Sequence, residues 1–335
     1  MISSLSGLAP FPLLILLGMF FGVFKIFDLQ NARTFNLFIF YVAIPCVIFE
    51  AVTKSNQENI NFGLLASYFV MQTIAGLLAF YITHKFFLRT KTEAIIWGLS
   101  VALSNHVLII LPLSQIFFDD SISLHVSSII VMDSVILISI VTLGLEYVSK
   151  TKVDLRKYSQ DLLKNPLVIA VLASVIVKTS GINLNDSIAE TVTSKLAQTT
   201  MPIGLISMGI ILSRYLNRLV TSLTVTISFL KLLFAPLALL IITGFSYQFN
   251  YPNDFLGTFL VSLGPCGAFS LALCAAYNVN PSEIVRAIFV STVISFFILL
   301  FIETRDKMIY DHKLLQMHYQ WRYKIYQPQI QLTLL

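Results

Sequence analysis

The chain has 335 residues, of which 56% are hydrophobic and only 12% are charged, and its mean hydropathy is +0.82. Soluble domains carry about 25% charged residues, so this composition excludes an ordinary soluble enzyme and indicates a polytopic membrane protein. The net charge of +5 does not indicate a nucleic-acid partner. The basic residues lie mostly in short connections between apolar runs, where they set the orientation in the membrane.

Ten apolar stretches are long enough to cross a bilayer, which takes roughly 20 residues of helix. In chain order they lie at about 8–26, 34–53, 63–86, 93–117, 123–147, 165–182, 188–212, 221–247, 255–278 and 283–302. The first stretch has no basic segment before it and no small-residue cleavage site after it, so we interpret it as a spanning helix rather than a signal peptide. The sequence therefore predicts an all-α integral membrane protein with ten transmembrane helices.

The two halves of the chain look related. A shift of about 157 residues aligns similar features along the whole sequence, which favours an internal repeat. It aligns Pro45 with Pro202, the polar stretch at Asn105 with Gly264-Pro265, and Asp133-Ser134 with Ser291-Thr292 one residue out of register. An odd number of helices in each repeat forces the second copy to be inverted in the membrane, so the sequence predicts two inverted five-helix repeats.

Four segments follow from this division. They are the first five-helix repeat (1–148), a cytoplasmic linker (149–164), the second, inverted repeat (165–303) and a C-terminal tail (304–335). The linker and the short connections on the same side hold most of the basic residues, which predicts that the N-terminus lies outside. Ten helices then place the C-terminus outside as well, in the plasma (inner) membrane, although the tail is itself basic.

Two predicted helices are interrupted at mid-membrane. The fourth contains Ser104-Asn105-His106 and then Pro112, and the ninth contains Gly264-Pro265-Cys266-Gly267. A broken helix frees N–H and C=O groups that hydrocarbon cannot satisfy, so they must face protein, water or a ligand. Breaks in corresponding helices of two halves point to the binding site of a transporter. The predicted substrate-binding residues are Asn105, His106, Pro112, Gly264, Pro265 and Gly267.

Each of these residues has a plainer interpretation. Asn105 offers two hydrogen-bond donors and an acceptor to a ligand, but it could instead stabilise helix packing. Pro112 and Pro265 remove a backbone donor, and a single proline in a membrane helix is more often an ordinary kink. Gly264 and Gly267 would let a ligand approach the backbone. If the two breaks cross, the half-helix N-termini there favour an anion.

Three ionisable side chains lie inside predicted helices. Asp133 is costly at mid-membrane and is a candidate proton carrier, unless it simply bonds to Ser134, Ser127 or a neighbouring helix. Histidine is the side chain suited to proton transfer near neutral pH, so His106 could couple transport to protons, or could be a neutral histidine bonded to a backbone carbonyl. Lys231 could balance the charge of an anionic substrate, whereas many such lysines extend to the lipid headgroups.

Enzyme activity is not expected. The sequence contains no HExxH, P-loop or GxSxG motif, and its three cysteines, Cys46, Cys266 and Cys274, lack metal-ligand spacing and resemble small core residues. We therefore expect no catalytic residue, cofactor or metal site. Pro45 and Pro202 are expected to shape static helices rather than to bind.

The order and spacing of several short motifs resemble the auxin efflux carrier family, which includes plant PIN proteins and bacterial malate/malonate permeases. These motifs are Ala43-Ile44-Pro45-Cys46-Val47-Ile48-Phe49, Asn105 through Pro112-Leu113, Asn165-Pro166-Leu167, Met201-Pro202-Ile203-Gly204-Leu205, and Pro265 followed by Ala275-Ala276-Tyr277. The resemblance extends over residues 8–303. Each motif is short, so its specificity comes from the order and spacing.

The resemblance implies a ten-helix fold similar to bile acid:sodium symporters, in which helices four and nine cross at prolines and form the substrate site. It also implies an elevator mechanism, in which helices three to five and eight to ten move against helices one, two, six and seven. The family's substrates are organic anions, and Asn105, Pro112 and Pro265 carry over by match. The chain departs from the family where His106-Val107-Leu108-Ile109-Ile110 replaces the usual glycines after the asparagine.

We therefore expect a secondary active or facilitative transporter of small organic anions, in particular carboxylates. Its partners would be the lipid bilayer, a proton or sodium as coupling ion, and no nucleic acid, while a homodimer is left open. One rival is a sodium-coupled symporter on the same fold. The sequence gives little evidence for a sodium site, because Ser262, Ser270 and few acidic residues lie around the second break. Another is a membrane receptor or sensor that kept the fold but lost transport.

Overall fold

The computed structural model describes residues 9–54, 61–118, 120–148, 166–182, 184, 187–215, 220–247 and 255–302. Its regular elements in these ranges are helices, joined at one point by an isolated backbone bridge. The predicted linker (149–164) and tail (304–335) lie outside the described residues. The expected all-α membrane class is confirmed, because several of these helices are long and apolar enough to cross a bilayer.

The helices follow the chain in two series. The first series is α2 (Pro10–Val23), α3 (Leu29–Phe38), η1 (Ile39–Ala43), α4 (Ile44–Lys54), α5 (Phe62–Lys85), α6 (Lys91–Ala102), η3 (His106–Ile110), α7 (Leu111–Phe117), α8 (Asp120–Met132), η4 (Asp133–Leu137) and α9 (Ile138–Val148). The second series is α11 (Pro166–Thr179), α12 (Ile188–Gln198), α13 (Thr200–Leu212), α14 (Ser222–Phe229), η5 (Leu230–Phe234), α15 (Ala235–Tyr247), α16 (Phe255–Ser262), α17 (Phe269–Ala276) and a final described helix, Ser282–Ile302. Capping boxes at Asp28, Thr90 and Thr221 start α3, α6 and α14, because each side chain accepts a backbone N–H that the first turn leaves free.

Six described helices meet the length and hydropathy of a membrane span, and three apolar helices are shorter. The six are Leu29–Lys54, Phe62–Lys85, Ser121–Val148, Ile188–Leu212, Ser222–Tyr247 and Ser282–Ile302, and the shorter ones are Pro10–Val23, His106–Phe117 and Pro166–Thr179. The predicted helices four and nine do not count as continuous spans because each is interrupted, as the sequence indicated. The crossing of all ten stretches, and their inverted repetition, stay predictions.

Wide turns of π-helix occur inside several of these helices, and proline explains most of them. η1, η3 and η5 each end two residues before a proline, at Pro45, Pro112 and Pro236. Proline cannot donate to the carbonyl four residues earlier and its ring collides with that carbonyl, so a wider turn relieves the clash. η4 has no such proline and instead begins at Asp133. That turn therefore needs another cause, and π-turns of this kind are frequent at functional sites.

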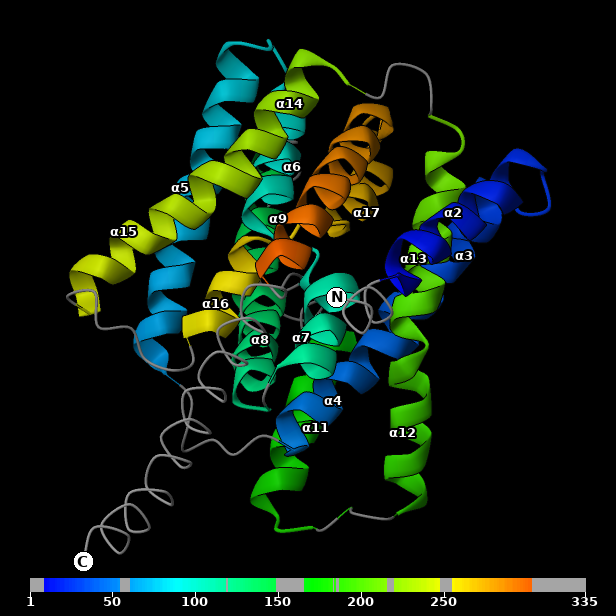
Figure 1. Ribbon diagram of the computed structural model, residues 1–335, viewed down its shortest axis with the longest axis vertical. Coiled ribbons are helices and arrows are strands. Elements are labelled where there is room, and N and C mark those ends of the chain that lie inside the picture. Colours follow the sequence, from blue (N-terminus) through cyan, green and yellow to red (C-terminus); the bar gives the residue numbers. More distant parts are fainter. Residues whose placement is uncertain are drawn as a thin grey trace, which may run out of the picture.

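The helices form two packed groups. In the group that we call the framework bundle, α2 and α3 pack on α13, and α4 packs on α11 and α12. In the other, the broken-helix bundle, α5 packs on α6 and α15, α8 packs on α16, and α17 packs on α6. The bundle also includes η3, η4 and η5, which continue into α7, α9 and α15, and the final described helix, which bonds to Cys266. Figure 1 shows α5, α14 and α15 on one side of the molecule and α2, α3 and α13 on the other. The bundles meet where η3 contacts α13, α8 contacts α4 and η4 contacts α11.

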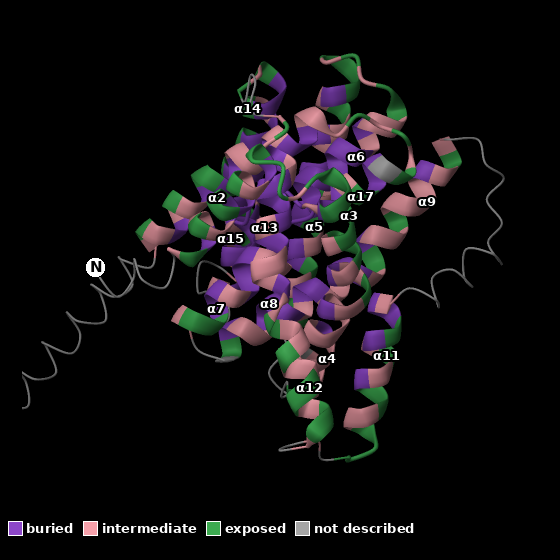
Figure 2. Ribbon diagram, turned by 90° about the vertical axis from the view of Figure 1, so that its right-hand side faces the viewer, coloured by how far each residue is buried: buried purple, intermediate pink, exposed green. Residues whose placement is uncertain are grey.

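Small residues allow the closest helix contacts. An added Cβ at Gly209 of α13 would lie 2.1 Å from the carbonyl oxygen of Ile15 in α2. In the other bundle a Cβ at Gly98 of α6 would lie 2.9 Å from the carbonyl oxygen of Gly76 in α5. Lipid tails are as apolar as leucine, so such close backbone packing is what holds membrane helices together. The buried side chains gather around α5, α6, α8 and α13, whereas α12 contributes none (Figure 2).

Candidate functional site

The two interrupted helices meet at their interruptions. The first break, residues 103–105, separates α6 from the half-helix made of η3 and α7, and the second break, residues 263–268, separates α16 from α17. Ser104 and Cys266 form an isolated antiparallel bridge, and the Asn105 N–H donates to the Pro265 carbonyl at 2.9 Å. The expected crossing is therefore present, and it lies at Ser104 and Asn105 rather than at Pro112. Pro112 lies inside this half-helix, where the wide turn of η3 accommodates the proline.

Three carbonyl groups at the end of α6 have partners. The Leu99 carbonyl accepts from the Leu103 N–H, and the Ser100 carbonyl accepts from the Gly267 N–H of the second break at 3.0 Å. The Val101 carbonyl accepts from the Lys231 ammonium at 3.0 Å. Since unpaired backbone groups are too costly in a membrane interior, these bonds are what allows the helix to end there.

Lys231 is fully buried against the first break. Its Nζ donates to the Ser104 hydroxyl at 2.6 Å, and that hydroxyl donates in turn to the Val261 carbonyl at the end of α16. One ammonium on η5 thus joins both broken helices. The alternative that Lys231 extends to the headgroups is wrong. An ammonium has three donors, and the third has no hydrogen-bond partner among the residues that the structure describes.

Asp133 and His106 form a buried pair beside the same break. Asp133 Oδ1 accepts from the Gln72 side-chain amide of α5 at 2.8 Å, and His106 Nε2 lies 3.0 Å from Asp133 Oδ2. Asp133 therefore bonds to a neighbouring helix rather than to Ser134 or Ser127, whose hydroxyls donate to carbonyls of their own helix. The alternative that His106 bonds to a backbone carbonyl is not seen among the described residues, because Nε2 faces the carboxylate and Nδ1 makes no hydrogen bond there.

Several polar atoms at the first break have no partner. The Asn105 side-chain Nδ2 and the His106 Nδ1 are buried and make no hydrogen bond within the described parts of the chain. The N–H groups of His106, Val107 and Leu108, at the start of the half-helix, likewise make no backbone bond to a described residue. Buried polar groups in native proteins are normally satisfied, so a cluster of unpaired ones indicates a missing ligand or water. Donors predominate in this cluster, which suits an anion.

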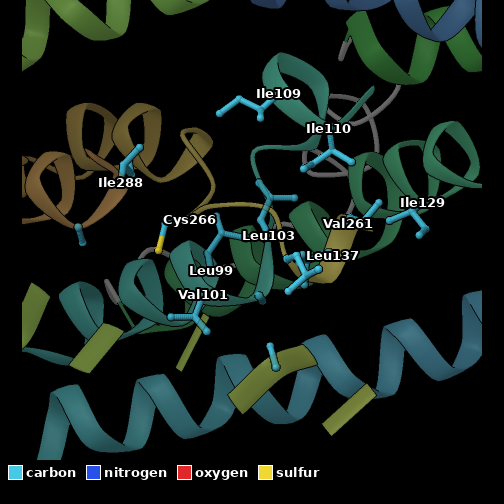
Figure 3. Close-up of a cluster of buried hydrophobic side chains, with 14 of the residues drawn as sticks. Leu99, Val101, Leu103, Ile109, Ile110, Ile129, Leu137, Val261, Cys266 and Ile288 are labelled. Carbon is cyan, nitrogen blue, oxygen red and sulfur yellow. The ribbon is translucent and has the colours of Figure 1, made fainter. Parts of the chain in front are cut away.

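Glycines at the second break make room for the other broken helix at the crossing. A Cβ at Gly267 would lie 2.7 Å from the Leu103 carbonyl oxygen, and one at Gly264 would lie 3.0 Å from Ile110 Cγ1. The space beside both glycines is thus filled by the other broken helix, and their contact with a ligand stays a prediction. Leu103, Ile110 and Cys266 lie in one apolar cluster with Val261 (Figure 3).

The final described helix braces the second break. The Ser291 hydroxyl accepts the Cys266 N–H at 3.1 Å, and the Ser295 hydroxyl donates to the Leu263 carbonyl at 2.7 Å. Ser291 thus bonds to the second break itself, whereas Asp133 bonds to His106, the residue that follows the first break. The second break is hydrogen-bonded by serine hydroxyls, whereas charged side chains lie at and beside the first break.

Three contributors to the site escaped the sequence analysis. Gln72, Ser104 and Ser291 all make hydrogen bonds at or next to the crossing. A buried glutamine in the middle of a predicted span was the available signal for Gln72, because amides are uncommon there. Ser104 had been noted only as part of the interruption, and nothing in the sequence alone indicated that it accepts from Lys231.

Comparison with known proteins identifies the family of the chain. The family model described as "Membrane transport protein" matches residues 4–303. The chain belongs to this family. The resemblance to auxin efflux carriers is thereby confirmed, and the chain is a multi-pass membrane transporter rather than a member of an enzyme family.

Curated relatives of the transporter carry the same general description. The chain is similar to the "Uncharacterized transporter YfdV" of Escherichia coli (strain K12), with 24% identity over 286 residues, which is 82% of this chain and 88% of the relative. It is also similar to an "Uncharacterized transporter" of Methanothermobacter thermautotrophicus, with 26% identity over 288 residues, which is 84% of this chain and 91% of the relative. These matches extend across both breaks, so the crossing lies within the part shared with other transporters.

Proposed function

We propose that this transporter carries small organic anions, in particular carboxylates, and that it binds them where the two broken helices cross. The observation that carries the proposal is the Lys231 ammonium, which is fully buried at the crossing and bonds only to a carbonyl and a hydroxyl among the described residues. A buried cation without a carboxylate on it is costly. An anionic substrate would accept from the remaining donor of this ammonium.

The unpaired donors at the first break define the rest of the site. Asn105 Nδ2 and the free N–H groups at the start of the half-helix can donate to the two oxygens of a carboxylate, as helix N-termini do for many anions. Gly264, Pro265 and Gly267 supply the crossing backbone, Pro112 fixes the start of α7, and His106 and Asp133 lie beside the site. Sodium needs several oxygen ligands, and here the Lys231 ammonium already holds the Val101 carbonyl and the Ser104 hydroxyl.

The two packed groups suggest how the substrate crosses. We propose that the chain spans the plasma membrane ten times as two inverted repeats, with both termini on the external side. In this proposal the broken-helix bundle slides as an elevator against the framework bundle and carries the site with it. The division supports this, because the hydrogen bonds that build the site join elements of the broken-helix bundle only. No bond of the site would then break during the movement.

Uptake into proteoliposomes tests the function. Purified protein would be assayed with labelled malate, malonate, pyruvate and indole-3-acetate, with and without sodium. Asn105→Ala removes a donor to the carboxylate, and we expect it to raise the KM for uptake about tenfold, which corresponds to about 1.4 kcal/mol. Asn61→Ala, which changes an asparagine that caps α5 far from the crossing, is the matched control.

Three results decide the proposal. Saturable, sodium-independent uptake of at least one of these anions, weakened by Asn105→Ala and not by Asn61→Ala, supports it. Uptake that requires sodium would move the assignment to a sodium-coupled symporter. Absence of flux and of binding for all four anions, with protein that is folded by size-exclusion chromatography, overturns the carboxylate assignment and favours a receptor or sensor.

A further inference from the structure

The charges buried around the crossing add up to an unusual set. Lys231 brings one positive charge and Asp133 one negative charge, and the two lie close enough to act on each other electrostatically. His106 is neutral or positive, according to its protonation. With a neutral His106 the charges of the site cancel, and with a protonated His106 the site carries one net positive charge.

From this set we infer that His106 takes up a proton together with the substrate, so that the carrier moves one monoanion and one proton with no net charge. The inference rests on the proposed function and deepens it, since it names the coupling ion, the group that holds it and the charge of the substrate. The proton would bind at His106 Nδ1 from the water on one side and leave to the water on the other.

The geometry of the pair singles out Nδ1. A carboxylate oxygen only accepts, so His106 Nε2, 3.0 Å from Asp133 Oδ2, carries the hydrogen and Nδ1 is left as the free nitrogen of the neutral ring. Nδ1 is buried and has no hydrogen-bond partner in the described ranges. A proton on Nδ1 creates a second buried donor at the first break, on the residue that follows Asn105, whose amide Nδ2 is also unpaired in the described ranges. The bound anion and the proton therefore stabilise each other.

The other titratable groups near the His106–Asp133 pair are few, and His106 is the proton acceptor in this inference. On the elements that pack against η3, the sequence of α8 contains His125 and, at its first position, Asp120, whereas α7, α13 and α16 contain no titratable residue. Around Asp133 and Lys231 lie Tyr68 of α5 and Cys266 of the second break. The Gln72 amide holds Asp133 Oδ1 and acts as a positioning residue, because it keeps the other carboxylate oxygen on the imidazole.

Charge balance explains why the two ligands should travel together. Moving a net charge through the low-dielectric membrane interior costs several kcal/mol. The empty site with neutral His106 has no net charge, and the site with a proton and a monoanion has none either. A dianion would leave one negative charge uncompensated. The site therefore favours a monocarboxylate over a dicarboxylate in its doubly ionised form.

Uptake of labelled pyruvate into proteoliposomes, with protein-free liposomes as the leak control, tests the stoichiometry. One proton per monoanion means that a gradient of about one pH unit supports about tenfold accumulation of pyruvate. A membrane potential imposed with potassium and valinomycin should add nothing. Malate kept as the dianion should accumulate less than pyruvate. Addition of pyruvate to weakly buffered, solubilised protein should remove about one proton from solution for each anion bound.

His106→Gln is the decisive variant, because glutamine can still donate to Asp133 but does not titrate. We expect it to abolish both the pH-driven accumulation and the binding-linked proton uptake, whereas His125→Gln, which changes the buried histidine of α8, should keep both. Saturable uptake that follows the membrane potential, or that keeps its pH drive in His106→Gln, overturns the inference and leaves the proposed function standing. Absence of any saturable anion uptake or binding overturns both.

Discussion

The two breaks meet in one antiparallel backbone bridge, but the chemistry around each of them differs. At the second break the freed groups bond to neutral hydroxyls, since Ser291 accepts the Cys266 N–H and Ser295 donates to the Leu263 carbonyl. At the first break the partners are the ammonium of Lys231 and the His106–Asp133 pair, and donors are left over. The two crossing helices therefore differ in charge, since ionisable side chains contact the elements next to the first break and neutral hydroxyls contact the second.

The difference indicates where selectivity lies. A hydroxyl satisfies a backbone group without changing the charge of the site, so the second break can hold the crossing together through every state of transport. The charged groups of the first break respond to the substrate and to pH. Variants at the first break should therefore change what is carried and what drives it, whereas variants at the second break should change how stably the site is held.

Replacing Lys231 with methionine should have the largest effect. Methionine keeps much of the side-chain volume but removes the positive charge, which leaves Asp133 uncompensated against an incoming anion. Loss of one member of a buried charge pairing costs about 2–5 kcal/mol, so we expect kcat/KM for anion uptake to fall by about a hundredfold or more. Uptake into proteoliposomes measures this.

The control is Lys195→Met, which removes an exposed lysine of α12 and should keep uptake within a few-fold of the wild type. Thermal unfolding of both variants separates lost binding from lost folding. Near-normal uptake by folded Lys231→Met would show that the buried ammonium only stabilises the end of α6. The first break would then have a structural role, like the second.

Replacing Gly267 with alanine should disturb the close backbone contact at which the two broken helices cross. The added Cβ would lie 2.7 Å from the Leu103 carbonyl oxygen, which is backbone and cannot rotate away. Overpacking of this kind costs about 1–3 kcal/mol, so the melting temperature should fall and uptake of every tested anion should fall together. A selective change for one anion would contradict a purely structural role.

Gly144→Ala is the matched control for this variant. Gly144 lies inside α9, where the nearest atom to an added Cβ is Ile95 Cδ1 at 4.0 Å. Alanine favours a helix over glycine by about 0.5–1 kcal/mol, so this variant should melt at the same or a higher temperature. An equal loss in both variants would mean that any glycine change in the bundle destabilises the protein.

The sequence was a good guide to the helices and to the existence of the two breaks. Long apolar runs and the polar stretch around Asn105 are properties of the chain itself, so helix positions and both interruptions could be predicted from the printed residues. The resemblance implied a crossing at prolines, and in helix four the crossing lies instead at Ser104 and Asn105, before Pro112.

The partners of the breaks could not be predicted in the same way. Lys231 is 130 residues from Val101, and Asp133 is 61 residues from Gln72, so each pairing depends on how the helices pack. A lysine in a membrane helix can reach either the headgroups or a buried carbonyl, and periodicity does not separate the two. Ser291 was visible only as an aligned position of the repeat.

Replacing Ser291 with alanine should have the smallest effect and sharpens the contrast between the breaks. The variant leaves the buried Cys266 N–H without its acceptor, which costs about 1–3 kcal/mol of stability. We expect a lower melting temperature and a modest loss of uptake, with the pH drive and the preference for pyruvate over malate unchanged. Ser246→Ala, which removes an exposed hydroxyl of α15 that bonds only within its own helix, is the control and should change neither stability nor uptake. A changed pH dependence in Ser291→Ala would mean that the second break takes part in coupling, because only groups linked to the His106–Asp133 pair should affect the proton that travels with the anion.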